Sequence, residues 1–183
     1  MPPNFSAAYA LAFCAGVYFA GRMAWWLPLA TLVATDLLLN AYYSWKYEMN
    51  AFQVYQVMNY VAFAAIIWLG KRFKPSSSFL GLLGGGIVGA LLFYLLTNTA
   101  AWLFNPFHNP EYTKTLTGWM IALTRGTGGY PETWEFFRIT LMSGGLFTGL
   151  FVGAMKLTEA PEPEEQEAED AEPEEVEPEK SEA

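Results

Sequence analysis

The sequence predicts an all-α integral membrane protein, a bundle of five transmembrane helices with one shorter interfacial or re-entrant helix. Three stretches without a charged residue support this prediction: 22 residues at 49–70, 36 residues at 75–110 and 17 residues at 139–155. A helix needs about 20 mostly apolar residues to cross the hydrocarbon core of a bilayer, whereas a soluble helix carries a charged face. We therefore expect the chain to lie in a lipid bilayer.

The C-terminal segment differs in composition from the rest of the chain. Residues 157–183 contain thirteen Asp or Glu and one Lys, whereas residues 1–156 contain nine Lys or Arg and five Asp or Glu. The net charge of −8 therefore describes the tail and not the body. A segment of Glu, Pro and Ala cannot bury enough apolar surface to fold. We expect a transmembrane domain over residues 1–156 and a disordered tail after it.

The first span is expected at about residues 5–20. Small residues recur at every fourth position of this span: Ala8, Ala12, Gly16 and Ala20. Residues with this spacing share one face of a helix and allow another helix to approach closely. Two uses of the face stay open, since it either packs against another helix of the same chain or docks a partner subunit.

The second span is expected at about residues 24–43, and it contains an acid. Asp36 lies two-thirds of the way along, where a carboxylate is costly in lipid and usually faces a protein interior or water. One alternative is a structural role, with a hydrogen bond between helices to Asn40 or Asn59. The other is a place in a binding or ion-coupling site.

The third and fourth spans are expected at residues 52–70 and 79–104. Gln56 and Asn59 share one face of the first turns of the third span, and we expect that face to point inward. Three glycines of the fourth span fall on one stripe: Gly81, Gly85 and Gly89. Such spacing in an apolar helix indicates a close helix contact.

A break follows residue 105, where two prolines end the fourth helix. Residues 112–124 predict a short helix, but only about ten uncharged residues separate Lys114 from Arg125, too few to span a bilayer. We expect this helix to be interfacial or re-entrant. The last span is expected at residues 133–156, and its packing stripe contains Gly145, Gly149 and Gly153.

The distribution of basic residues predicts the orientation. With five spans, one side of the membrane receives Arg22, Lys71, Arg72, Lys74 and Lys156. The other side receives Lys46, Lys114 and Arg125. Because cytoplasmic loops carry an excess of Lys and Arg, we assign the first group to the cytoplasm. The N-terminus then lies outside and the acidic tail lies in the cytoplasm.

Amide and aromatic side chains gather on the outer side under this topology. They supply directional hydrogen bonds and flat stacking surfaces, which suit a small polar or heterocyclic ligand. The expected substrate site contains Asn4, Asp36, Asn40, Gln56, Asn59, Asn98, Trp102, Tyr112 and Arg125. The alternative is an interfacial belt of aromatic and helix-capping residues. Asn98 favours the site most, because an amide within an apolar run needs a buried partner.

An enzymatic role is not expected. His108 and Cys14 are the only residues of their types, which excludes metal sites built from several such residues. No nucleophile motif lies near His108. The glycines of the fourth span lack the Lys-Ser or Lys-Thr that follows a phosphate-binding loop. We expect no metal, no cofactor and no nucleic-acid partner.

Three groups of residues carry a resemblance to a known family. They are Pro2-Pro3-Asn4-Phe5-Ser6; Leu27-Pro28-Leu29 leading to Thr35-Asp36-Leu37; and Thr97-Asn98 with Trp102, Tyr112 and Gly118. Together they resemble an uncharacterised family of bacterial integral membrane proteins described as transport proteins, over most of residues 2–156. Its members carry a further hydrophobic helix upstream, which implies six spans with both termini in the cytoplasm; this sequence has five.

More loosely, the chain is similar to the substrate-binding S components of energy-coupling factor transporters, small six-helix proteins that capture vitamins for a separate ATP-driven module. This resemblance implies a subunit of the bacterial inner membrane that captures a small polar or heterocyclic micronutrient from the outer face. It also implies energising membrane and ATPase partner subunits, docked on the small-residue face of the first helix. The alternative is a non-catalytic accessory or scaffold subunit whose acidic tail recruits a basic cytoplasmic partner.

Overall fold

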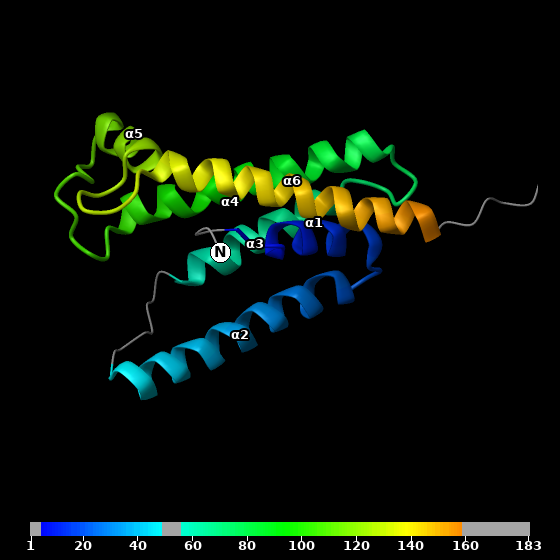
Figure 1. The fold of residues 1–183 in the computed structure, drawn as a ribbon, viewed down its shortest axis with the longest axis horizontal. Coiled ribbons are helices and arrows are strands. Elements are labelled where there is room, and N and C mark those ends of the chain that lie inside the picture. Colours follow the sequence, from blue (N-terminus) through cyan, green and yellow to red (C-terminus); the bar gives the residue numbers. More distant parts are fainter. Residues whose placement is uncertain (1–4, 49–55, 159–183) are drawn as a thin grey trace, which may run out of the picture.

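The computed structural model describes residues 5–48 and 56–158, and within these ranges the secondary structure is entirely helical. The predicted all-α class is confirmed. Six helices follow one another along the chain (Figure 1): α1 (Ala8–Tyr18), α2 (Met23–Tyr47), α3 (Val57–Gly70), α4 (Phe79–Phe104), α5 (Leu116–Thr124) and α6 (Thr133–Thr158). Asn4 and the acidic tail beyond residue 158 lie outside the described residues.

Three of the six helices are long and apolar enough to cross a membrane. They are α2, α4 and α6, with 25, 26 and 26 residues. At a rise of 1.5 Å per residue each is about 38 Å long, against a hydrocarbon core of about 30 Å. α1 and α3 are apolar but have only 11 and 14 residues. The described residues thus contain three membrane-length helices, where the sequence predicted five spans.

Helix-capping residues mark three of the helix boundaries. α4 begins after Ser78, whose hydroxyl accepts a hydrogen bond from the backbone N–H of Gly81, and it ends at Asn105 in the left-handed conformation. These bounds agree with the predicted 79–104. The short helix was predicted from residue 112, but α5 begins at 116, because Thr115 is extended and its hydroxyl accepts from the N–H of Gly118. Such an N-cap residue marks a helix start.

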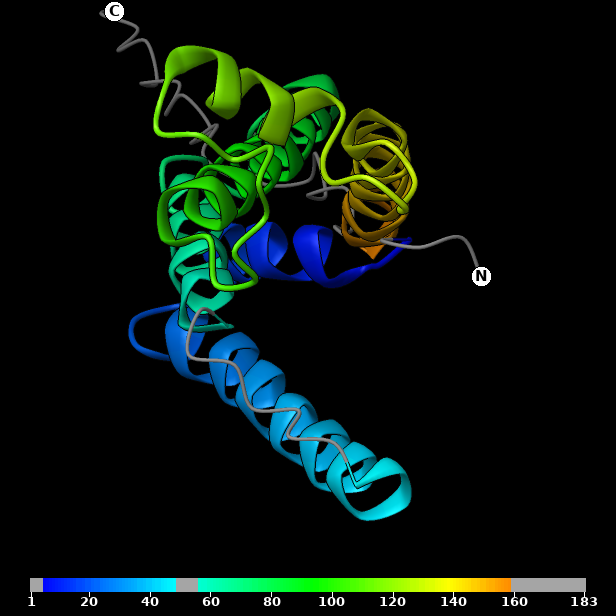
Figure 2. The same ribbon diagram turned by 90° about the vertical axis from the view of Figure 1, so that its left-hand side faces the viewer.

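α1 lies at the centre of the bundle, packed against α3, α4 and α6 (Figure 2). Eight of its 11 residues are buried. Phe13 is fully buried, as are Ile66 of α3, Leu82 of α4 and Val152 of α6. This cluster forms the core of the bundle.

The small-residue face of α1 is used inside the chain. A Cβ added to Gly16 would lie 2.3 Å from the carbonyl oxygen of Ile67, and one added to Gly70 would lie 2.3 Å from that of Phe13, so the backbones of α1 and α3 touch. Ala12 is also buried, whereas Ala20 lies beyond the end of α1 and is exposed. Ala12 and Gly16 are therefore buried inside the chain and are not free surface for a partner, and docking of a partner on this face stays a prediction.

α4 and α6 also approach closely. Gly86 of α4 faces Thr148 of α6, and Gly144 of α6 faces Ala90 of α4, each with side-chain atoms within 2.7 Å of an added Cβ. The stripe predicted for α6 makes only ordinary contacts at Gly145, Gly149 and Gly153, with nearest atoms at 3.5–3.9 Å. The closest approach therefore lies one residue earlier than the sequence predicted.

α2 is set apart from the other helices. The N-terminal end of α2 lies against the bundle, and the helix diverges from the bundle toward the C-terminal end of α2 (Figures 1 and 2). Only Ala24 and Asn40 of its 25 residues are buried. Its contacts are with α1 and α3.

Candidate functional site

Two side-chain hydrogen bonds join the C-terminal half of α2 to the start of α3. The hydroxyl of Tyr60 donates to Asp36 Oδ2 at 2.7 Å, and the amide of Asn40 donates to Gln56 Oε1 at 3.3 Å. Asp36 and Asn40 are four residues apart on α2, as are Gln56 and Tyr60 at the start of α3. Residues with this spacing share a face of a helix, and the reversed order of the pairs fits two antiparallel helices. We call these four residues the α2–α3 seam.

The seam gathers a carboxylate, two amides and a phenol. Asn40 is buried, with 7% of its surface exposed, and the other three are half-buried. Amides offer both donors and acceptors, whereas an ionised carboxylate only accepts. This set can bind a cation, an amine or a polar ring by hydrogen bonds.

The partner of Asp36 differs from the one that the sequence indicated. Asn40 and Asn59 were the expected partners, but Asn40 contacts Gln56 and the hydrogen bond to Asp36 comes from Tyr60. Asn59 and Tyr60 are neighbours in sequence and therefore point about 100° apart around α3. Tyr60 is not among the predicted site residues. The matching spacings of four residues on the two helices were the signal that pointed to it.

A second polar group joins the end of α4 to α5 and the loop before it. The indole N–H of Trp102 donates to the carbonyl of Thr113 at 2.7 Å, and that of Trp119 donates to the hydroxyl of Thr99 at 2.9 Å. The ammonium of Lys114 donates to the carbonyls of Trp102 and Leu103 and lies 5.3 Å from the Trp102 ring centroid. We call these contacts the α4–α5 cap.

The α4–α5 cap closes the C-terminal end of α4. The last carbonyls of a helix have no partner within it, and a cation there also interacts favourably with the helix dipole. Lys114 supplies both a donor and the charge. Its position after two prolines is therefore explained by helix capping, without a ligand.

Asn98 and Tyr112, two residues of the predicted site, lie on α4 and on the loop before α5. The amide of Asn98 donates to the carbonyl of Tyr94 at 2.8 Å, one turn earlier in α4, so its buried partner belongs to its own helix. Burial raises the pKa of the Tyr112 phenol, and the charge of Glu111 raises it further. Tyr112 is therefore neutral at physiological pH. Arg125 is exposed at the end of α5.

The predicted site residues thus fall into two groups. The seam contains Asp36, Asn40 and Gln56, and Asn59 lies half-buried on α3 beside it. The other group lies on α4, on α5 and on the loop between them: Asn98, Trp102, Tyr112 and Arg125. Figure 1 shows α5, the start of α3 and the C-terminal end of α2 on the same side of the molecule, with α5 at the top and α2 at the bottom.

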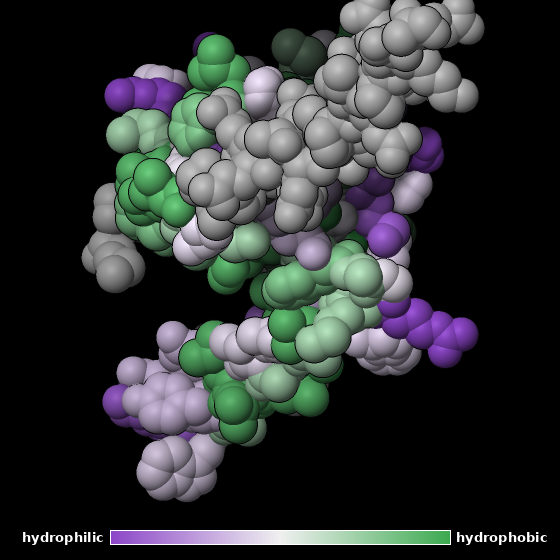
Figure 3. Space-filling view, turned by 90° about the vertical axis from the view of Figure 1, so that its right-hand side faces the viewer, coloured by the Kyte–Doolittle hydropathy of each residue, from purple (hydrophilic) through white to green (hydrophobic). Residues whose placement is uncertain are grey.

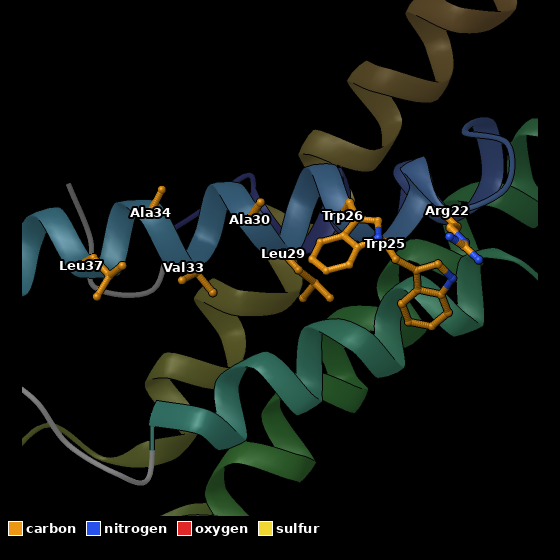
Figure 4. Close-up of a pocket in the computed structure, with 8 residues that line it drawn as sticks. All are labelled: Arg22, Trp25, Trp26, Leu29, Ala30, Val33, Ala34 and Leu37. Atoms are coloured by element: carbon orange, nitrogen blue, oxygen red, sulfur yellow. The ribbon is translucent and has the colours of Figure 1, made fainter.

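A groove of about 720 Å³ runs along α2. Figure 4 shows its lining residues: Arg22, Trp25, Trp26, Leu29, Ala30, Val33, Ala34 and Leu37. It is apolar except at the Arg22 end. None of the eight predicted site residues that the structure describes lines this groove. A hydrophobic groove on a membrane-length helix is suited to lipid chains and not to a polar ligand.

The described part of the chain contains no group of side chains that could bind a metal ion. Within residues 5–48 and 56–158, no three His, Cys, Asp or Glu side chains gather in a way that could hold an ion.

The hydrogen bond between Trp119 and Thr99 gives a test of the α4–α5 cap. Trp119→Phe and Thr99→Val are each expected to lower the free energy of unfolding by about 0.5–1.5 kcal/mol, because each leaves a half-buried group without its partner. The double variant should lose less than the sum of the two, since both remove the same bond. Unfolding in detergent micelles measures all three, and strictly additive losses would contradict the contact.

Comparison with known proteins identifies a family but no activity. No curated protein and no solved structure matches the chain, so the resemblance to S components stays a prediction. The model of a family of unknown function (DUF6580) matches residues 1–166, which includes every helix of the structure. The chain belongs to this family, DUF6580.

Proposed function

We propose that the chain is a multi-pass membrane subunit that binds a small polar or heterocyclic molecule at the α2–α3 seam and delivers it to a partner module for uptake. In this proposal α2, α4 and α6 span the membrane, the shorter α1 and α3 complete a bundle of five spans, and α5 lies at the interface. The membrane is the bacterial inner membrane. The observation that carries the proposal is the Asp36–Tyr60 hydrogen bond.

A carboxylate within a membrane-length helix requires a reason. Asp, Glu, Lys and Arg in such helices are rare, and they usually belong to substrate or ion pathways. Asp36 accepts its hydrogen bond from a phenol, which is neutral and leaves the negative charge of an ionised carboxylate uncompensated. A ligand with a positive charge or with N–H donors would stabilise that charge, and this supports a binding role.

The position of the seam supports capture from outside. The seam lies in the C-terminal half of α2 and the first turn of α3, whereas Arg22, Lys71, Arg72 and Lys74 lie at the other ends of these two helices. Because the basic side of a membrane protein faces the cytoplasm, the seam is the part of α2 and α3 nearer the outer face. A ligand would enter there.

Ligand binding can be tested without knowing the ligand. Purified protein is heated in detergent with each member of a panel of water-soluble heterocycles and small amines. A compound that binds the folded protein raises its melting temperature, because at a concentration of 100 times the Kd it adds about 2.7 kcal/mol to the free energy of unfolding. We expect at least one compound to do so. Asp36→Asn and Tyr60→Phe should lose the shift.

A matched control separates binding from folding. Asn98→Ala also removes a polar group from a membrane-length helix, but among the described residues the Asn98 amide donates to the carbonyl of Tyr94 in its own helix, so this variant should retain the shift. A shift that survives in Asp36→Asn, or disappears equally in Asn98→Ala, would contradict a site at the seam.

The composition of the tail favours a second candidate function. Thirteen acids and one Lys in residues 157–183 form a strongly negative segment, which suits an accessory subunit that recruits a basic cytoplasmic partner. Deleting residues 159–183 tests this role. Loss of a co-purifying partner with ligand binding intact would support recruitment, whereas an unchanged set of partners would contradict it.

A further inference from the structure

One end of the molecule collects positive charge from three separate segments. We call it the basic end, and it contains Arg22, Lys71, Arg72, Lys74 and Lys156. Figure 1 shows the α1–α2 turn, the α3–α4 loop and the end of α6 together at this end. Figure 3 views the molecule from it, with hydrophilic side chains lying among apolar ones. The four basic side chains on the α1–α2 turn and the α3–α4 loop are exposed.

The acids that the structure describes lie elsewhere. Asp36 is in the middle of α2, and the other four described acids are at the opposite end: Glu48, Glu111, Glu132 and Glu135. Four cations accompany them there: Lys46, Lys114, Arg125 and Arg138. Charge at that end is therefore balanced. The segments 19–22 and 71–78 of the basic end contain no acid.

The acidic tail starts at the basic end. The ammonium of Lys156 donates to the carbonyl of Pro75 at 2.9 Å, which fixes the last turn of α6 to the α3–α4 loop. The tail, residues 159–183, follows three residues later, with thirteen acids and one Lys. A tethered chain of about 25 residues has a root-mean-square end-to-end distance of roughly 25–30 Å. The loop is therefore within reach of the whole tail.

We propose that the tail, residues 159–183, binds the basic end of its own chain, with Lys71, Arg72 and Lys74 as its principal contacts. Charge complementarity favours this occupant. The tether also holds the tail at an effective concentration in the millimolar range, well above that of a free acidic protein. The competitor is the headgroup of an anionic phospholipid, which the same cations attract.

Zero-length carbodiimide coupling of the full chain in phosphatidylcholine vesicles tests the proposal. This reagent joins a carboxylate to a lysine amine only where the two are in contact, and peptide mass spectrometry then identifies the pair. We expect tail carboxylates coupled to Lys71 and Lys74, with a yield that does not fall on dilution of the protein. Raising the salt to about 1 M, where the Debye length is about 3 Å, should abolish the coupling.

Internal and variant controls make the outcome decisive. Lys46, at the opposite end, should show no coupling to the tail. Arg72→Glu should reduce the coupling of Lys71 and Lys74 to the tail at least severalfold. Lys46→Glu, which makes the same reversal of charge at the opposite end, should leave this coupling unchanged. Equal coupling at both ends, or a yield that falls on dilution, would overturn the proposal. Loss of coupling when phosphatidylglycerol replaces part of the phosphatidylcholine would identify the lipid headgroup as the occupant.

Discussion

Gly16→Leu is expected to separate α1 from α3 and to destabilise the whole bundle. An added Cβ at this position would lie 2.3 Å from the carbonyl oxygen of Ile67 and 3.0 Å from the Cα of Gly70, both backbone atoms that cannot rotate away. Overpacking of a core typically costs about 1–3 kcal/mol when side chains can adjust. Here only a shift of two helices relieves the clash, so we expect at least the upper end of that range.

Gly84→Ala is the matched control for that variant. Gly84 also lies within a helix, but nothing is within 4 Å of an added Cβ, and alanine is favoured over glycine in a helix interior by roughly 0.5–1 kcal/mol. The control should therefore be neutral or slightly stabilising. Thermal unfolding in detergent micelles compares the two. A Gly16→Leu protein as stable as the natural chain would contradict the close crossing of α1 and α3.

Phe13→Ala is the second change with a large expected effect. Phe13 is fully buried, and its ring makes an edge contact with that of Phe73 at 5.3 Å between centroids. It also fills the space above Gly85 of α4. Removing a buried phenylalanine side chain typically costs about 3–5 kcal/mol, because the surroundings collapse only partly into the cavity. We expect a loss in this range.

Leu11→Ala provides the comparison on the same helix. Leu11 is 50% exposed, so its truncation should cost well under half as much as that of Phe13. In a bilayer the exposed part of the Leu11 side chain contacts lipid tails, which are as apolar as leucine, so lipid fills the space left by the truncation. Equal losses for the two variants would contradict the placement of α1 at the centre of the bundle.

The sequence predicted the helical class and the bounds of α4 because these depend on local signals. The uncharged runs at 75–110 and 139–155 coincide with the membrane-length helices α4 and α6, whereas the run at 49–70 contains α3, which has 14 residues. Ser78 and the left-handed Asn105 mark the two ends of α4. The start of α5 was placed four residues too early, although Thr115 is an ordinary N-cap residue.

The arrangement of the helices depends on contacts that a single sequence does not specify. Asp36 and Tyr60 are 24 residues apart, and either asparagine was as good a partner on polarity alone. The divergence of α2 from the bundle, which divides the predicted site into two groups, also has no periodic signal in the sequence. Asn98 illustrates the remaining difficulty, since an amide in an apolar run predicts a partner but does not say that the partner is in the same helix.

Native mass spectrometry of the gently purified natural chain tests the central claim most directly. We expect a second species, heavier by the mass of one small polar molecule, and we expect this species to be absent from Asp36→Asn prepared in the same way. The opposite result, an identical ligand-bound species in Asp36→Asn, would show that binding does not depend on the carboxylate that links α2 to α3.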